Sequence, residues 1–167
     1  MSDKKTMTYY PGCSSQGSGK HLDESLRAVM PAVGIEMVDI EDWNCCGASV
    51  GHIGGGQLPN LALTGRNLAK AEQLGAQDVI TGCAACYLNT HGGNEKIKAD
   101  VQKRAAINEA LGAAGMSYTA DLKVRHACEV LVNEVGVEKI KERVTNPLTG
   151  LKVAGWIGCQ TVRPFAG

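Results

Sequence analysis

The chain has 167 residues with seventeen basic and seventeen acidic side chains, so its formal net charge is zero. A neutral chain lacks the basic surplus that phosphate binding needs, which argues against nucleic acid as a partner. No apolar run approaches the ~20 residues that span a bilayer, and the hydrophobic share of 44% is typical of one globular domain.

Strands and helices are predicted to alternate in the first half of the chain, and helices dominate the second half. The elements follow in chain order: a strand at 7–12, a helix at 20–33, a strand at 35–40, a helix at 58–74, a strand at 78–81, helices at 94–111, 124–135 and 137–144, and a strand at 151–157. Strand–helix–strand alternation predicts an α/β fold, with a small parallel β-sheet and flanking helices.

Five of the seven cysteines follow predicted strands. Cys13 comes after the first strand, Cys45 and Cys46 after the second, and Cys83 and Cys86 after the third. The carboxyl ends of parallel strands meet at one edge, which is the usual site of function in open α/β sheets. We therefore expect all five thiols to converge at the C-terminal edge of the strands.

Five thiols are one more than a tetrahedral zinc ion takes. They suit a polynuclear iron–sulfur centre, in which several irons share the ligands. Adjacent cysteines such as Cys45 and Cys46 serve two irons more readily than one ion, and Gly47 lets the backbone turn there. Zinc bound by four of the five remains an alternative. A thioredoxin-like redox pair at Cys83 and Cys86 would leave the other cysteines unexplained.

The remaining cysteines and histidines give weaker indications. Cys128 falls on a predicted apolar helix stripe, which predicts a place in the core. His21 is predicted on a helix surface. His52, in a glycine-rich loop, and His91, shortly after the fifth cysteine, could carry a proton to a leaving thiolate or be exposed loop residues. A structural role is the interpretation for His126.

The end of the chain repeats the pattern of its beginning. Residues 151–159 have a basic residue, a strand pattern, an aromatic residue, glycine and a cysteine, as residues 5–13 do. We therefore expect one complete repeat over 1–150, and over 151–167 the opening strand and first cysteine, Cys159, of a second, truncated repeat.

The cysteine spacing, Cys-x31-Cys-Cys-Gly-x35-Cys-x2-Cys, resembles the CCG (cysteine-rich) domain of the heterodisulfide reductase B subunit. The resemblance covers essentially the whole chain. Flanking segments that also match are Tyr10-Pro11-Gly12-Cys13, Asn44-Cys45-Cys46-Gly47-Ala48, Asn67-Leu68-Ala69, Gly82-Cys83-Ala84-Ala85-Cys86, Val124-Arg125-His126, Gly158-Cys159-Gln160 and Arg163-Pro164.

The resemblance implies a noncubane [4Fe-4S] cluster held by Cys13, Cys45, Cys46, Cys83 and Cys86. It implies one component of a disulfide or thiol oxidoreductase, in which substrate sulfur binds iron beside Cys45 and Cys46, with His52 as a further catalytic candidate. The implied partners are a C-like subunit with cubane iron–sulfur clusters and an A-like subunit with flavin and iron–sulfur clusters.

The implied location is the cytoplasm, because the chain shows neither a signal peptide nor a transmembrane segment. Four of the five cysteines expected for a second motif are missing from this sequence. We therefore expect this fragment alone to be inactive. The alternative function is a zinc-binding structural or assembly module without turnover.

Overall fold

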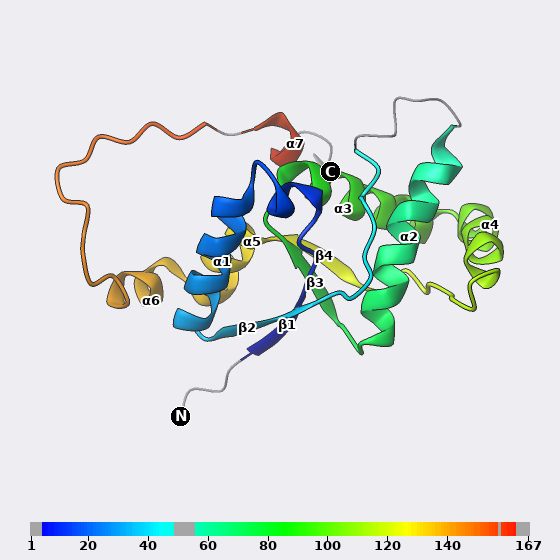
Figure 1. The fold of residues 1–167 in the computed structure, drawn as a ribbon, viewed down its shortest axis with the longest axis horizontal. Coiled ribbons are helices and arrows are strands. Elements are labelled where there is room, and N and C mark those ends of the chain that lie inside the picture. The colour runs from blue at the N-terminus through cyan, green and yellow to red at the C-terminus, as the bar shows by residue number, and fades with distance from the viewer. Residues whose placement is uncertain (1–4, 49–55, 157, 163–167) are drawn as a thin grey trace.

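Four parallel strands form a single sheet in the order β2-β1-β3-β4 (Figure 1). The computed structural model describes residues 5–48, 56–156 and 158–162. Tyr9, the last residue of β1, pairs with Asp39 of β2 and with Ile80 of β3, so the strands end close to one level. The strands are β1 (Lys5–Tyr9), β2 (Ile35–Asp39), β3 (Asp78–Thr81) and β4 (Lys123–His126).

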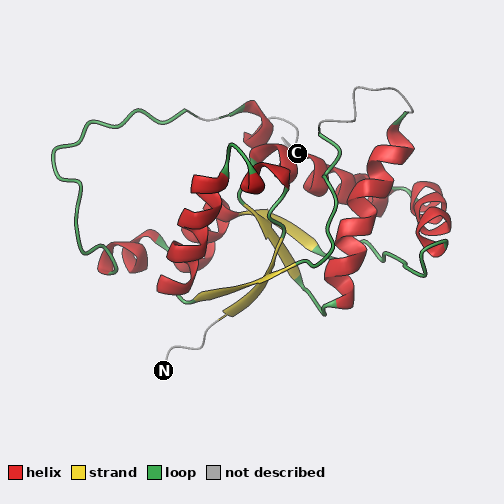
Figure 2. Cartoon of the chain, in the orientation of Figure 1, coloured by secondary structure: helices red, strands yellow, loops and turns green. Residues whose placement is uncertain are grey.

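Helices cover both faces of this sheet (Figure 2). On one face α1 and α5 enclose a buried cluster that includes Ile80, and on the other α2, α3 and α4 enclose a cluster that includes Val79. The helical elements are η1 (Cys13–Gln16), α1 (Lys20–Ala32), α2 (Gln57–Gln73), α3 (Ala84–Ala99), α4 (Val101–Gly112), α5 (Ala127–Val130), the π-helical turn η2 (Leu131–Val135), α6 (Val137–Glu142) and α7 (Cys159–Val162).

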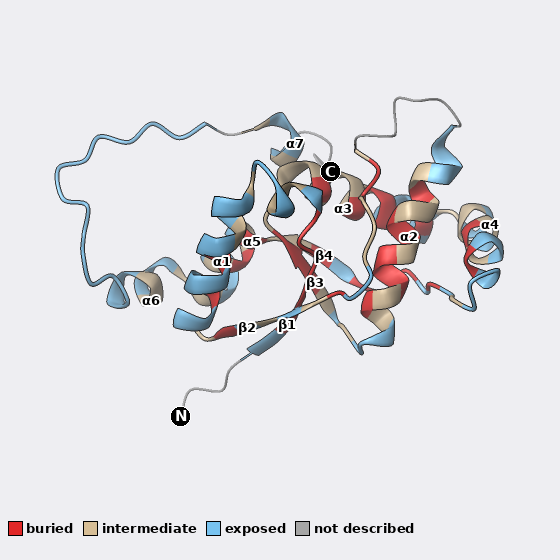
Figure 3. Cartoon of the chain, viewed as in Figure 1, coloured by how far each residue is buried: buried red, intermediate tan, exposed pale blue. Residues whose placement is uncertain are grey.

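Val79 and Ile80 show why β3 lies at the centre of the fold. Successive strand side chains point to opposite faces, and both of these residues are almost fully buried. Burying each such side chain contributes roughly 1.5–3 kcal/mol. Figure 3 shows the same pattern, with a buried sheet between helices whose outer surfaces are exposed. None of the helices in the described ranges is long and apolar enough to cross a membrane.

The predicted α/β fold with a parallel sheet is confirmed. Each of its first five elements is present, although the first strand, predicted at 7–12, lies at 5–9. The predicted strand at 78–81 coincides with β3, and the predicted helices at 20–33 and 58–74 match α1 and α2 to within a residue at each end. In α1, Leu26 and Met30 are buried as the apolar stripe predicts, whereas Leu22 and Val29 are exposed.

Three predictions for the second half are wrong. The single helix predicted at 94–111 is two helices, α3 and α4, because Asp100 leaves the helical conformation and its carboxylate accepts hydrogen bonds from the N–H groups of Gln102 and Lys103. Residues 123–126 form strand β4 rather than the predicted helix. Residues 151–156 form no strand, and Trp156 is 95% exposed there.

Cys128 is exposed, which corrects its predicted place in the core. Because β4 continues to His126, helix α5 begins only at Ala127, and the residues that it buries are Ala127 and Val130. Cys128 lies between them on the outer side of that single turn.

Candidate metal centre

The five cysteines predicted as ligands all lie just beyond the carboxyl ends of β1, β2 and β3. Cys13 begins η1, Cys45 and Cys46 lie in the loop after β2, Cys83 is the N-cap of α3, and Cys86 is in its first turn. Cys46 and Cys86 are each 1% exposed, and Cys13 is the most exposed of the five. The site therefore has a buried inner side and an open outer side.

The thiols contact one another in a connected set. Cys13 interacts with Cys45, Cys45 with Cys46, Cys46 with Cys86, and Cys86 with Cys83. Residues from three separate loops are thus brought together, as the predicted strand order requires.

Two glycines make room for this set. Gly12 has a φ of +74°, and a Cβ built on it would lie 2.5 Å from the Sγ of Cys86. Gly47 has a φ of +92°, and its Cβ would overlap the Oδ1 of Asn60 on α2. Both positions combine a left-handed backbone with a close approach, so a side chain is excluded at each.

The loop that carries Cys45 and Cys46 is held by an amide pair. The Asn44 N–H donates to Asn67 Oδ1 at 2.8 Å, and Asn67 Nδ2 donates to the Asn44 carbonyl at 2.8 Å. The Tyr10 hydroxyl donates to the same carbonyl, also at 2.8 Å. Asn67 is fully buried on α2, so the position of the loop is fixed against the core.

Hydrogen bonds within the set favour thiolates at two of the cysteines. The Cys86 thiol donates to Cys83 and lowers the pKa of Cys83 to about 5, although burial opposes the shift; backbone N–H groups of α3 contribute in the same direction. The same thiol hydrogen, shared between the two sulfurs, also lowers the pKa of Cys46 to about 7. The pKa of Cys86, the donor, is raised by these same bonds. The thiolate is the form that binds metal.

Although Cys13 is exposed as a residue, partial desolvation of its thiol raises its pKa, and the charge of Cys45 adds to the shift. A bound cation would reverse that shift by stabilising the thiolate. The donor set fits an iron–sulfur centre. Its five sulfurs come from three loops, and a cluster with several irons can bind them although they are not all directed at one ion. The described residues include no group of three or more His, Cys, Asp or Glu side chains arranged to hold one metal ion.

The candidate histidines lie around Tyr87, and His126 is also close enough to Cys83 to interact with its charge. His126 accepts a hydrogen bond from the N–H of Cys128 and meets Tyr87 edge-on, and burial lowers the pKa of its imidazole. His91 is on α3 rather than in a loop, with its Nδ1 3.1 Å from the Val124 carbonyl oxygen and its ring stacked on Tyr87. These contacts pack both imidazole rings against Tyr87 beside the sheet.

Three further predictions concern His21, His52 and Cys159. His21 is exposed on α1, as predicted. His52 lies outside the described residues. Cys159 is exposed at the start of α7, which packs against α3 (Figure 1).

Sequence reasoning missed the role of Asn67. Its neighbours Leu61 and Leu68 predict an apolar helix face, and a polar residue within such a face has to find buried partners. A side-chain amide at position 67, on the apolar face of α2, indicates that this helix holds another segment of the chain. It does not indicate which segment.

An open parallel sheet with five thiols at the end of its strands defines a cysteine-rich α/β domain. The chain belongs to the CCG family of cysteine-rich domains, whose family model matches residues 7–90. A crystal structure of a hypothetical protein from Helicobacter pylori has the same fold, with a TM-score of 0.61 and 21% identity over 73% of this chain and 24% of that one.

Three curated relatives align with nearly the whole chain. The 8-methylmenaquinol:fumarate reductase membrane anchor subunit of Wolinella succinogenes is 35% identical over 96% of this chain and 55% of its own length. A protein of Archaeoglobus profundus, named as similar to the B subunit of heterodisulfide reductase, is 31% identical over 92% and 51%. The B subunit of the ferredoxin/F420H2-dependent CoB-CoM heterodisulfide reductase of Methanosarcina acetivorans is 30% identical over 95% and 52%. The chain spans about half the length of these relatives.

Proposed function

We propose that this chain is the iron–sulfur redox domain of a heterodisulfide reductase-like complex, which reduces disulfides or oxidises thiol or persulfide substrates. The observation that carries the proposal is the connected set of five thiols at one sheet edge, with Cys46 and Cys86 buried and Cys13 exposed. Such a set has the ligands for a metal cluster and an open side for a substrate.

The five cysteines would hold a noncubane [4Fe-4S] cluster. When bound, such a cluster supplies one-electron transfer and an iron site for substrate sulfur. The Cys86 thiol hydrogen, shared between Cys46 and Cys83, lowers the pKa of both and so favours the thiolates that bind metal. The clamp between Asn44 and Asn67 holds the loop of Cys45 and Cys46, beside which the substrate sulfur would lie.

The proposal includes partners and a division of the chain. Residues 1–150 would form a first CCG domain, and 151–167 would lead into a second one.

Electrons would come from a C-like iron–sulfur protein and an A-like flavoprotein of the same complex in the cytoplasm. His52 is a candidate proton carrier. Two relatives are named as the B subunit, or as similar to it, which supports a multi-subunit complex. This chain alone is not expected to turn over substrate.

A second candidate function is a zinc-stabilised assembly module without turnover. The name of the Wolinella succinogenes relative, a membrane anchor subunit, supports a role in assembly rather than in chemistry. Four thiolates are the number that a structural zinc takes, although the side chains of the described residues are not arranged around one ion. Metal content separates the two functions.

The test is anaerobic purification followed by iron, sulfide and zinc analysis, with EPR of an oxidised sample. We expect about four irons and four sulfides per chain, with a paramagnetic signal from the oxidised cluster. Replacing Cys46 or Cys86 by serine should abolish iron binding, whereas Cys128→Ser, which changes an exposed thiol outside the set, should keep it. One zinc per chain without iron would establish the assembly function instead.

A further inference from the structure

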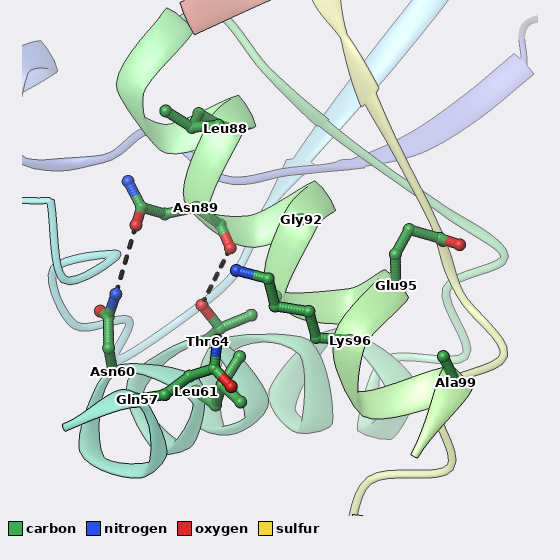
Figure 4. Close-up of a pocket in the computed structure, with 11 residues that line it drawn as sticks. Gln57, Asn60, Leu61, Thr64, Leu88, Asn89, Gly92, Glu95, Lys96 and Ala99 are labelled. Carbon is green, nitrogen blue, oxygen red and sulfur yellow. Dashed lines mark hydrogen bonds between the residues drawn. The ribbon is translucent and has the colours of Figure 1, made fainter. Parts of the chain in front are cut away.

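The thiol set is closed toward the cleft between α2 and α3 and open on the side of η1. The cleft has a volume of about 580 Å³ (Figure 4). On its wall, Asn89 donates its Nδ2 hydrogen to the Ala85 carbonyl at 2.9 Å. The Cys46 thiol meets the same carbonyl oxygen at 3.9 Å, and Cys46 is 1% exposed. The cleft therefore ends before the sulfurs, and the exposed Cys13 at the start of η1 marks the open side of the set.

Ser14, the residue after Cys13, lies beside another cysteine of the set. A narrow space between η1, α1 and the residues after β3 is lined by both Ser14 and Cys83. The Ser14 hydroxyl donates a hydrogen bond to the Cys83 sulfur. This bond adds to those from the Cys86 thiol and from backbone N–H groups of α3 in lowering the pKa of Cys83. The loop after β1 thus supplies a hydroxyl to a sulfur of the loop after β3.

Glycines fix both of these loops close to α1. The Ser14 carbonyl accepts a hydrogen bond from the N–H of Gly19 at 2.8 Å, and a Cβ on Gly19 would lie 3.1 Å from the same carbonyl oxygen. Gly82, the residue after β3, has no room for a side chain because its Cβ would overlap Leu26 Cδ1 of α1. The position of the hydroxyl relative to the sulfur is therefore set by the backbone of two tightly packed turns.

Ser14 keeps its hydrogen when the cysteines become metal ligands. Cysteine binds metal as the thiolate, so Cys86 would lose the hydrogen that it donates to Cys83. A serine hydroxyl retains its hydrogen and remains a donor. Hydrogen bonds to the sulfurs are among the factors that set the reduction potential of an iron–sulfur cluster. A donor favours the more negative of two states, which is the reduced one.

We propose that the Ser14 hydroxyl hydrogen-bonds the Cys83 sulfur while that sulfur ligates the cluster, and so raises the reduction potential of the cluster. This inference rests on the proposed function of the thiol set. Ser14 is a positioning residue, because it acts through Cys83. The couple takes up one electron, from the iron–sulfur partner in the complex or from dithionite in a titration, and no bond is broken.

The experiment is a redox titration of the full chain, loaded with iron under anaerobic conditions and followed by the EPR signal of the oxidised cluster. Ser14→Ala should keep its iron and lower the midpoint potential by about 59 mV, which is tenfold in the equilibrium constant of a one-electron couple. One hydrogen bond to a charged group contributes about that factor.

Ser15→Ala is the matched control. The Ser15 hydroxyl donates to the Gly12 carbonyl at 2.6 Å, so its loss loosens the same turn without removing a hydrogen bond to Cys83. The potential of this variant should stay at the wild-type value. As a second measurement, the Fe–S(Cys) bands in the resonance Raman spectrum of the wild type should shift in D2O, and Ser14→Ala should lose part of that shift.

An unchanged potential in Ser14→Ala, or an equal fall in Ser15→Ala, would overturn the proposal. So would a D2O shift in Ser14→Ala as large as that of the wild type. Loss of iron from Ser14→Ala alone would make the hydroxyl a requirement for assembly and overturn its effect on the potential. The two proposals fail differently, because a wild type without a cluster refutes the redox function, whereas a cluster whose potential ignores Ser14 refutes this inference alone.

Discussion

Gly12 and Cys86 come from different parts of the chain, yet the Cβ that Gly12 lacks would lie 2.5 Å from the Sγ of Cys86. The loop after β1 therefore runs directly over a buried thiol in the first turn of α3. With a φ of +74°, Gly12 also has a backbone conformation that other residues seldom adopt. This contact joins the loop of Cys13 to the loop of Cys83 and Cys86.

Replacing Gly12 by alanine should displace the Cys86 sulfur and weaken metal binding. We expect the free energy of unfolding to fall by about 2–4 kcal/mol, the sum of left-handed strain and overpacking. Iron per chain after anaerobic reconstitution should fall by more than half. Urea unfolding and iron analysis of the same preparations measure both effects.

Gly115→Ala is the matched control for Gly12→Ala. Gly115 has a φ of +68°, but a Cβ there meets no atom within 4 Å. Its replacement should cost only the strain of about 1 kcal/mol and leave iron binding intact. If the two variants lose equal stability and both bind iron normally, the contact with Cys86 has no role in the site.

The positions of the five cysteines could be predicted because the end of a strand is determined by residues that are neighbours in the sequence. Each of β1, β2 and β3 has two or three apolar or aromatic residues within four or five positions, followed by glycine, proline or polar residues. Parallel alternation then brings their carboxyl ends to one edge. The first half of the chain follows this rule, and the bounds of Asp78–Thr81 agree with its prediction at both ends.

The second half could not be predicted in the same way. Strand β4 has only four residues, and Val124 is the one whose side chain is buried. So short a segment does not show the alternation of buried and exposed side chains that identifies a strand. The apolar spacing of the residues after β4 therefore predicts a helix that includes the last three residues of the strand. In that longer helix Cys128 is expected on the buried face. The link from Asn67 to Asn44 spans 23 residues and depends on tertiary packing, which no local pattern encodes.

Asn67→Leu should release the loop of Cys45 and Cys46. The substitution leaves the Asn44 N–H without its partner, at a cost of about 2 kcal/mol. In metal-free protein the buried Cys46 should become reactive toward a thiol reagent at least several-fold faster, as peptide mapping of alkylated protein would show. Asn133→Leu, at an exposed site, should change stability by less than about 0.5 kcal/mol. An unchanged Cys46 rate would show that the loop does not need the clamp.

Gly93→Ala should destabilise the packing of α2 on α3 although alanine favours helices. A Cβ at Gly93 would lie 2.8 Å from Thr64 Cγ2. Overpacking of about 1–3 kcal/mol should exceed a propensity gain of about 1 kcal/mol. Gly112→Ala, in open space at the end of α4, should be neutral or stabilising. Thr64→Ala combined with Gly93→Ala should recover part of the loss, and strict additivity in that double-mutant cycle would contradict the contact.

Glu134 should make the fold sensitive to acid. Hydrogen bonds from Arg125 and then Lys5 lower the pKa of its carboxyl to about 2, from an ordinary value of 4.5. Because the folded-state pKa is the lower one, the carboxylate's contribution is complete above pH ~4.5 and is lost as the pH falls toward 2. Solvent screening at this partly exposed pair limits the contribution to roughly 1 kcal/mol.

The difference in unfolding free energy between the wild type and Glu134→Gln should therefore be about 1 kcal/mol at pH 7 and should shrink toward zero near pH 2. Chemical denaturation at a series of pH values measures it. Glu138→Gln removes an exposed carboxylate that pairs with Lys141 and should give a smaller difference at pH 7. A difference for Glu134→Gln that stays constant from pH 7 to pH 2 would mean that its ion pairs with Arg125 and Lys5 do not hold β1 and β4 to the turn after α5.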